Sequence, residues 1–258
     1  MIEITGAERD VLILDILKRL EESKPHADAG KWELGWRAAL DKFRANPCEE
    51  SLVPDFIRDL PVRHRGGFYR GLSELDYVRK MQEWLSQQFI DCATVYEFGC
   101  GTGFNLVALS HLLPADFCGF DRSKCAVQVV REASAKLDLP IGADCFDMLK
   151  PSPYLIPPNT GVFTFGAMEQ LGDFKPFLNY LIEAKPKVVC HIEPISELLD
   201  PNNLVDWLSL KFHEKRGYTV GMVPYLNTHP GVEVVSVERS YFGSLMLESY
   251  ARVVWRPR

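Results

Sequence analysis

The sequence lacks features that mark several classes of protein. Its seven cysteines include no Cys-x-x-Cys pair, the spacing typical of zinc sites and disulfide frameworks, so we expect most of them to be inert core thiols. Its apolar runs are far shorter than the ~20 residues of a membrane-spanning helix, and the N-terminus lacks the basic and apolar layout of a signal peptide. Basic residues are not in excess: 29 Lys and Arg stand against 35 Asp and Glu, which disfavours nucleic-acid binding. We therefore expect a cytoplasmic protein with neither membrane nor nucleic-acid partners.

The first part of the 258-residue chain is predicted to be a helical cap or lid over residues 1–70. Two stretches there have apolar residues at helical spacing, and the first follows a capping-box pattern that begins at Thr5. A third helix, capped by Ser73, is expected to open a second domain over residues 71–258. The segment 61–70 is basic, aromatic and rich in glycine, and is predicted to be a loop. The apolar stripes of the three helices are Ile13, Ile16, Leu17 and Leu20, then Trp32, Trp36, Leu40 and Phe43, then Val78, Met81, Leu85 and Phe89.

From residue 93 short apolar strands alternate with amphipathic helices. This alternation is typical of βαβ units, in which parallel strands form one sheet. The last two strands have no helix between them, which predicts an antiparallel hairpin at the sheet edge. The sequence thus predicts an α/β domain with a mostly parallel sheet. The expected strands are 93–98, 117–120, 142–145, 161–165, 188–192, 232–238 and 250–255, and the expected helices between them are 104–112, 123–137, 174–184 and 203–215.

The most informative motif lies where the first of these strands turns into a helix. Glu97 is followed by glycines at alternate positions, Gly99, Gly101 and Gly103. Glycines at such a turn let a ligand approach the backbone at the start of a helix, which predicts a cofactor loop. A dinucleotide fingerprint needs a third glycine at position 104 or 106, where a phenylalanine and a leucine stand. We therefore do not expect NAD binding.

The acid and glycine pattern resembles the first motif of class I S-adenosylmethionine-dependent methyltransferases. Three further segments, Gly119–Asp121, Ala143–Asp147 and Phe163–Gln170, are similar to that family in order and spacing. The resemblance covers about residues 70 to 258. It implies a Rossmann-like, seven-stranded methyltransferase sheet that binds S-adenosylmethionine.

The resemblance also implies roles for single residues in cofactor binding. Glu97 would meet the amino group of the cofactor, and Asp121 would accept from its ribose hydroxyls. Asp144 would accept from the adenine amine, and Phe146 would stack on the ring. Each acid also has an alternative role without a ligand. Asp121 would cap the next helix, and Asp144 would be a solvated turn residue. The full set of implied cofactor-binding residues is Tyr69, Glu97, Gly99, Gly101, Gly103, Asn105, Asp121, Asp144, Cys145, Phe146 and Phe165.

The acceptor is predicted to be a small molecule. The Asn-Pro-Pro-Tyr or Asp-Pro-Pro-Tyr element, typical of enzymes that methylate amino groups of nucleic acids, is absent after the fourth strand, where Gly166–Glu169 stands. Segments outside the cofactor motifs, such as His191–Pro194 and Ser249–Trp255, are similar to sugar O-methyltransferases. That similarity implies methyl transfer to a hydroxyl of a sugar or related metabolite. N-methylation of an amine or peptide, a non-catalytic binding subunit with this fold, and a homodimer stay open.

The candidate catalytic residues follow the fourth and fifth strands. His191 and Glu193 lie on one face of the fifth strand, since side chains alternate there, and would act as general base and orienter or, with Asp173, as part of a metal site. Glu169 is the other candidate base, and we assign no metal ligands. The alternative is that His191 is a hydrogen-bonded core histidine and Glu193 a capping or ion-paired residue.

Overall fold

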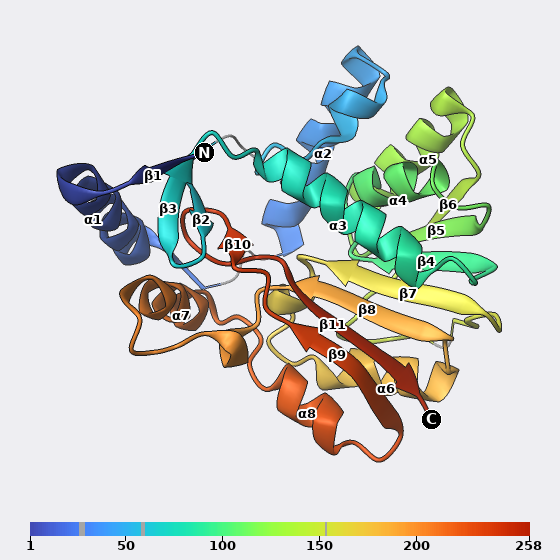
Figure 1. Cartoon of the computed structure of the whole chain (residues 1–258). Helices are drawn as coiled ribbons and strands as arrows, with labels where there is room; N and C mark the ends of the chain where they lie inside the picture. Colours follow the sequence, from blue (N-terminus) through green and yellow to red (C-terminus); the bar gives the residue numbers. More distant parts are fainter. Residues whose placement is uncertain (26–28, 58–59, 153) are drawn as a thin grey trace.

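A seven-stranded sheet forms the centre of the molecule (Figure 1). The computed structural model describes residues 1–25, 29–57, 60–152 and 154–258. The strands are β4 (Thr94–Phe98), β5 (Asp116–Asp121), β6 (Ile141–Cys145), β7 (Thr160–Phe165), β8 (Val188–Glu193), β9 (Val232–Glu238) and β11 (Ala251–Pro257). Their order is β6-β5-β4-β7-β8-β11-β9. The first five in this order are parallel, and β11 is antiparallel to both β8 and β9. The predicted parallel sheet with an antiparallel C-terminal hairpin is confirmed.

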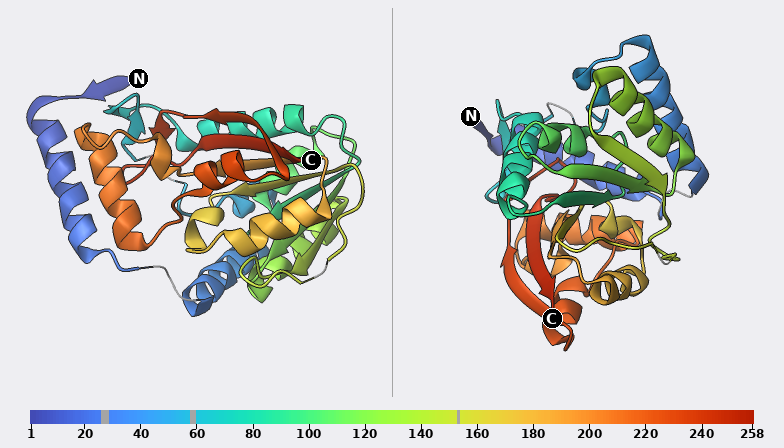
Figure 2. Two further views of the ribbon diagram at one scale, coloured as in Figure 1. Left: turned by 90° about the horizontal axis from the view of Figure 1, so that it is seen from below. Right: turned by 90° about the vertical axis from the view of Figure 1, so that its right-hand side faces the viewer.

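Helices cover both faces of this sheet (Figure 2). They are α3 (Glu74–Gln88), α4 (Phe104–Ser110) and α5 (Lys124–Leu137) on one face, and α6 (Lys175–Ala184) and α8 (Met222–Thr228) on the other. Successive strand side chains point to opposite faces, so Val95 packs in the core under α3 to α5 and Tyr96 in the core under α6 and α8. Because the five strands are parallel, their carboxyl ends meet at one edge of the sheet.

Of the two helix caps predicted at Thr5 and Ser73, only the second is formed. Ser73 caps α3 as expected, since its hydroxyl accepts from the N–H of Asp76 at 3.1 Å. Thr5 precedes α1 (Gly6–Glu22), but its side chain makes no capping hydrogen bond. The capping box predicted at the start of α1 is therefore wrong, although the helix itself is present.

A second sheet corrects the prediction for residues 61–70. β2 (Val62–His64) and β3 (Gly67–Arg70) form an antiparallel hairpin there instead of a loop. Both turn residues, Arg65 and Gly66, have positive φ (47° and 78°), the conformation of two-residue turns that match the twist of the strands. The sequence did not reveal this turn because arginine is an uncommon residue at its first position.

The small sheet joins the two ends of the chain. Its order is β1-β3-β2-β10, with β1 (Ile2–Ile4) from the N-terminus and β10 (Phe242–Gly243) from the segment before β11. It packs with α1 and α7 (Leu204–Arg216) through Ile4, Ile16, Phe68, Val205, Leu208 and Leu245 (Figure 1). Residues 1–70 and 71–258 therefore share one small sheet and its core.

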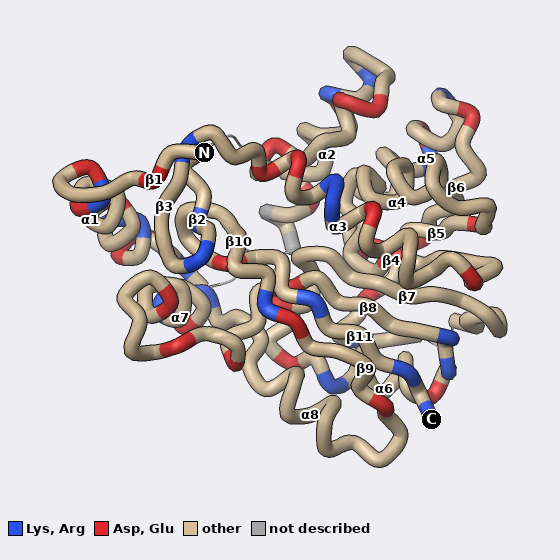
Figure 3. Tube along the Cα trace, viewed as in Figure 1, with Lys and Arg blue, Asp and Glu red and all other residues tan. Residues whose placement is uncertain are grey.

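The helix α2 (Ala29–Ala45) and the short 3-10 helix η1 (Glu49–Leu52) add to the core beneath α3 to α5 through Leu40, Phe43 and Leu52. Acidic and basic residues lie side by side on outer helices such as α1 (Figure 3). In the part of the chain that the structure describes, no helix is both long and apolar enough to cross a bilayer.

Candidate active site

The candidate site lies at the carboxyl ends of the parallel strands, where ligands bind in open α/β sheets. Two adjoining cavities of about 350 and 110 Å³ are found there. The larger one extends from the turn after β4 to the segment before β11, and the smaller one lies over the ends of β5 and β6. The residues that line both cavities are Trp32, Trp36, Gly99, Gly166 and Gln170.

The glycine turn after β4 forms a wall of the site. Gly99 and Gly101 have positive φ (78° and 52°), which other residues rarely adopt. A Cβ on Gly99 would overlap the Cβ of Ala167, and a Cβ on Gly101 would lie 2.6 Å from Cη2 of Trp36. Neither position admits a side chain without movement of its neighbours. Gly103 packs against α5 and does not line either cavity.

Glu97 presents a buried carboxyl group to the larger cavity, and it is 1% exposed. Its Oε1 accepts from Nδ2 of Asn105 at 2.8 Å, and Oδ1 of Asn105 accepts from Nε2 of Gln82 at 3.0 Å. Its Oε2 is buried and has no hydrogen-bond partner among the described residues. Burial raises the pKa of Glu97 to about 8, and the charge of Asp121 adds to this rise. A cationic hydrogen-bond donor would satisfy the free oxygen and favour the ionised carboxylate.

Asp121 ends β5 and lines the smaller cavity. Its Oδ2 accepts from the N–H of Gly101 at 3.1 Å, and its Oδ1 accepts from the N–H of Ser123 at 2.9 Å. Burial raises the pKa of Asp121, and the two hydrogen bonds oppose that rise. The carboxylate thus supports both the glycine turn and the start of α5. Each oxygen keeps a further lone pair for a ligand.

The loop after β6 places its carboxylates differently from the sequence-based expectation. Asp144 is exposed and outside both cavities, where its carboxylate lies 3.5 Å from Nη2 of Arg131. Cys145 is also exposed and outside them, because β6 continues through it in register with β5. Phe146 and Asp147 follow the strand and line the smaller cavity. The carboxylate of this loop that reaches a cavity is therefore Asp147.

Helix α2 contributes two aromatic walls that the sequence did not identify. Trp32 and Trp36 lie one helical turn apart with stacked rings, 6.0 Å between centroids, and line both cavities. Glu33 lies between them in the sequence and accepts from the hydroxyl of Ser123 at 2.6 Å and the N–H of Cys125 at 3.2 Å. These bonds hold α2 against the start of α5. The spacing of the two tryptophans predicted only a helix. The approach of Trp36 to Gly101 is a contact between distant parts of the chain, which local spacing does not reveal.

Aromatic residues from β7 and from the segment before β11 meet at the larger cavity. The rings of Phe165 and Tyr250 are 5.8 Å apart, and the Tyr250 hydroxyl donates to Oε1 of Glu74 at 2.6 Å. All three residues line the cavity. Tyr69 does not, because it lies on β3, with its ring 5.7 Å from that of His64. The structure therefore does not bring Tyr69 to the predicted cofactor site.

Glu169 and Glu193 form a buried carboxyl pair. Glu169 lines the larger cavity, its Oε1 accepts from Nε2 of Gln170 at 2.9 Å, and its Oε2 has no partner among the described residues. Oε1 of Glu193 accepts from the N–H groups of Ala167 and Met168, both at 3.1 Å. Burial, and then the charge of Glu169, raise the pKa of Glu193 well above its usual range. Glu193 lines neither cavity and instead holds the turn that carries Glu169.

His191 is a core residue. It is 0% exposed, its Nδ1 lies 2.8 Å from Oγ1 of Thr164, and its Nε2 accepts from Nε1 of Trp255 at 3.0 Å. The indole can only donate, so Nε2 is the unprotonated nitrogen and Nδ1 carries the hydrogen. Burial lowers the pKa of His191 to about 3. The predicted pairing of His191 and Glu193 on one face holds, but that face packs against the core under α6 and α8. The structure therefore contradicts the prediction of His191 as a base that faces the acceptor.

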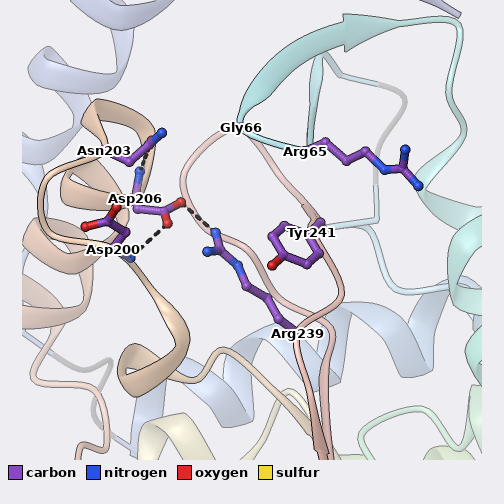
Figure 4. Close-up of a pocket in the computed structure, with 7 residues that line it drawn as sticks. All are labelled: Arg65, Gly66, Asp200, Asn203, Asp206, Arg239 and Tyr241. Carbon is purple, nitrogen blue, oxygen red and sulfur yellow. Dashed lines mark hydrogen bonds and ion pairs between the residues drawn. The ribbon is translucent and has the colours of Figure 1, made fainter.

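A separate depression of about 520 Å³ lies beside the small sheet and α7 (Figure 4). Asp206 accepts from Nη2 of Arg239 at 2.7 Å, and Arg239 also donates to Glu248. Arg65 points away from this group (Figure 4). The described residues that line this depression leave no buried polar side-chain atom without a partner, in contrast to Glu97 and Glu169.

Solved structures with the same arrangement show the fold. SpnF, described as a [4+2]-cyclase, is 12% identical, with a TM-score of 0.63 over 91% of this chain and 97% of that chain. A geranyl diphosphate methyltransferase solved with GPP and sinefungin is 10% identical, with a TM-score of 0.51 over 69% of this chain and 77% of that chain. RosA from Streptomyces davawensis, the N,N-8-amino-8-demethyl-D-riboflavin dimethyltransferase, is 13% identical, with a TM-score of 0.52 over 72% of this chain and 55% of that chain. The chain has the class I methyltransferase fold.

No protein-family model matches the sequence, and no curated protein does either. Within the methyltransferase fold, the structure brings one part of the predicted set to the two cavities and leaves the other part outside. The residues that line a cavity are Glu97, Gly99, Gly101, Asn105, Asp121, Phe146, Phe165 and Glu169. Those that line neither are Tyr69, Gly103, Asp144, Cys145, His191 and Glu193.

Proposed function

We propose that the protein transfers a methyl group from S-adenosylmethionine to a small-molecule acceptor held in the larger cavity. The observation that carries this proposal is the buried Oε2 of Glu97, which lacks a partner among the described residues and lies beside a glycine turn that excludes side chains. The α-ammonium group of the cofactor is the kind of donor that this oxygen requires.

We retain the cytoplasmic location and the homodimer as predictions from the sequence.

The residues at the two cavities fit the parts of the cofactor. Glu97 would hold its ammonium group, and Asp121 has lone pairs for the ribose hydroxyls. Phe146 and Asp147 would face the adenine ring, in place of the pair Asp144 and Phe146 expected from the sequence. When bound, S-adenosylmethionine supplies a methyl group on a positively charged sulfur. The protein aligns the acceptor with that group and removes a proton from the acceptor.

Glu169 is the residue that we propose as the general base. It lines the larger cavity, and its Oε2 is without a partner among the described residues. The acceptor atom is then a hydroxyl oxygen, as in the sugar or related metabolite expected from the sequence, or an amine nitrogen. Glu193 would act as a positioning residue, because its hydrogen bonds fix the turn that carries Glu169.

One comparison favours a second candidate function. SpnF is described as a [4+2]-cyclase, and a [4+2] cyclisation involves no methyl transfer. The fold therefore also accommodates a protein whose larger cavity shapes a substrate for a different reaction. Release of S-adenosylhomocysteine separates the two candidates.

Calorimetric titration tests the cofactor part of the proposal. We expect the protein to bind S-adenosylhomocysteine and S-adenosylmethionine but not NAD. Glu97→Gln should weaken binding at least about tenfold, because the charge-assisted hydrogen bond to the ammonium group is lost. Glu183→Gln, on the exposed side of α6, is the matched control and should bind normally. Binding of NAD alone, or unchanged affinity in Glu97→Gln, would contradict the proposal.

A further inference from the structure

We propose that the acceptor is an amine on an apolar, partly aromatic skeleton, and that Glu169 binds its ammonium group and takes up its proton. This inference rests on the methyl transfer proposed above and names the acceptor class for the same cavity. It departs from the sugar hydroxyl expected from the sequence. Charge, an unsatisfied buried oxygen and the walls of the cavity each support it.

The charge of the larger cavity favours a cationic guest. Among the described residues that line it, three carry carboxyl groups, Glu74, Glu97 and Glu169, and one carries a cationic group, Arg216. Arg216 donates from Nη1 to a backbone carbonyl at 2.9 Å. Glu74 accepts from the Tyr250 hydroxyl, and Glu97 belongs to the cofactor end. Glu169 is therefore the carboxyl group that is left for the acceptor.

Oε2 of Glu169 is buried in a residue that is 8% exposed, and it has no hydrogen-bond partner in the part of the chain that the structure describes. A buried carboxylate oxygen without a donor is costly, and an ammonium N–H supplies both the hydrogen bond and the opposite charge. Glu193 lies against Glu169, and two neighbouring buried carboxyl groups do not readily ionise together. Burial raises the pKa of Glu193 well above its usual range, so Glu193 is the member of the pair that holds a proton.

Part of the remaining wall is apolar or aromatic, which suits an apolar skeleton. Val78, Phe104, Phe165, Leu247 and Tyr250 line the larger cavity and do not line the smaller one. A sugar would bring several hydroxyl groups here, and each buried hydroxyl without a partner costs free energy. Aromatic faces attract a cation as well as apolar groups. An amine with an apolar or aromatic body matches these walls better than a polyhydroxylated ring.

The reaction balances with the residues present. An ammonium nitrogen has no free electron pair, so it first gives a proton to Oε2 of Glu169. The nitrogen then donates its electron pair to the methyl carbon and forms the N–C bond, while the C–S bond breaks and its pair stays on sulfur. The products are the N-methylammonium ion, S-adenosylhomocysteine and protonated Glu169, which returns its proton to water.

Matched amine and alcohol probes test the inference. With S-adenosylhomocysteine saturating at pH 7.5, benzylamine and cyclohexylamine are titrated beside benzyl alcohol, cyclohexanol and methyl glucoside. We expect at least one amine to bind about tenfold more tightly than its alcohol, the size of one charged hydrogen bond. Glu169→Gln should abolish this difference without a change in S-adenosylhomocysteine affinity, and Glu183→Gln should retain it. With S-adenosylmethionine, mass spectrometry should find a methylated amine.

Several results would overturn the inference. These are failure of every amine to bind better than its alcohol, tighter binding of methyl glucoside than of the amines, or an amine preference that survives in Glu169→Gln. Each of these results can occur while S-adenosylhomocysteine still binds normally. The proposed methyl transfer fails by a different result: the protein then does not bind S-adenosylhomocysteine or S-adenosylmethionine when no acceptor is present.

Discussion

At the scale of single residues, we expect the carboxyl group of Glu97 to lose its proton when the cofactor binds. Its pKa is raised from 4.5 to about 8 by burial, so the carboxyl group of the free protein holds a proton at neutral pH. The ammonium group of the cofactor requires the carboxylate. Ligand binding therefore expels a proton from Glu97 wherever the pH lies below 8.

We expect the affinity for S-adenosylhomocysteine to rise about tenfold per pH unit from pH 6 to nearly 8 and then to level off. Calorimetry in buffers of different ionisation enthalpy should detect about one proton released at pH 6.5. Glu97→Gln should remove this proton release. In the free protein the sign is opposite: stability falls as the pH rises from 4.5 towards 8, because the unfolded chain gives up the proton first. A pH-independent affinity in the wild type would contradict the assignment of Glu97.

His191 gives a prediction about stability. Its pKa is lowered to about 3 by burial, so between pH 6.5 and 3 the unfolded chain binds a proton that the folded protein does not. His191→Gln should therefore lower the free energy of unfolding at pH 7.5 by about 2 kcal/mol, since Thr164 and Trp255 lose their partner. It should also remove a decline of about 1.4 kcal/mol per pH unit on acidification below 6.5. Urea unfolding at several pH values measures both effects, and an unaltered acid slope in the variant would contradict them.

At the scale of elements, α2 connects the N-terminal part of the chain to the cofactor site. Glu33 bonds to the start of α5, and this contact sets the position from which Trp32 and Trp36 line both cavities. We therefore expect a ligand that fills either cavity to contact an indole ring.

Tryptophan fluorescence reports this contact. We expect S-adenosylhomocysteine to change the emission of the protein, and Trp36→Phe to remove most of that change, because Trp36 lies against Gly101. Trp207→Phe, on the exposed surface of α7, is the matched control and should keep the response. The same response in both variants would mean that Trp36 does not contact the ligand.

At the scale of the whole molecule, the two ends of the chain depend on each other. β10 pairs with β2, and buried Arg63 donates from Nε to the carbonyl of Leu245 at 2.8 Å and from Nη1 to that of Val205 at 2.6 Å. Burial lowers the pKa of Arg63 to about 10. The segment before β11, which lines the larger cavity, is thus held by an element from the first 70 residues.

We expect a chain shortened to residues 71–258 to lose cooperative unfolding. It would expose the core surfaces that Leu40, Phe43, Leu52 and Phe68 cover, and it would leave β10 without a partner strand. Differential scanning calorimetry of the shortened and full chains measures this. A sharp transition in the shortened chain, with normal S-adenosylhomocysteine binding, would show instead that residues 71–258 fold as an independent domain.

Local patterns were enough to predict most of the large sheet. Its strands, from Thr94–Phe98 to Ala251–Pro257, lie within two residues of the predicted bounds, because alternation and helical periodicity are properties of neighbouring residues. The glycine turn after Glu97 was predictable for the same reason, since strand, turn and helix follow one another directly.

Contacts between distant segments were decided only by the tertiary structure. Alternation correctly placed His191 and Glu193 on one face of β8, but only the packing of α6, α8 and Trp255 made that face a core. Likewise the approach of Trp36 to Gly101 joins parts of the chain that no local pattern relates. The sequence by itself thus determined which elements form and where the cofactor turn lies. The packed structure decided which side chains reach the cavities, because that depends on how whole elements cover one another.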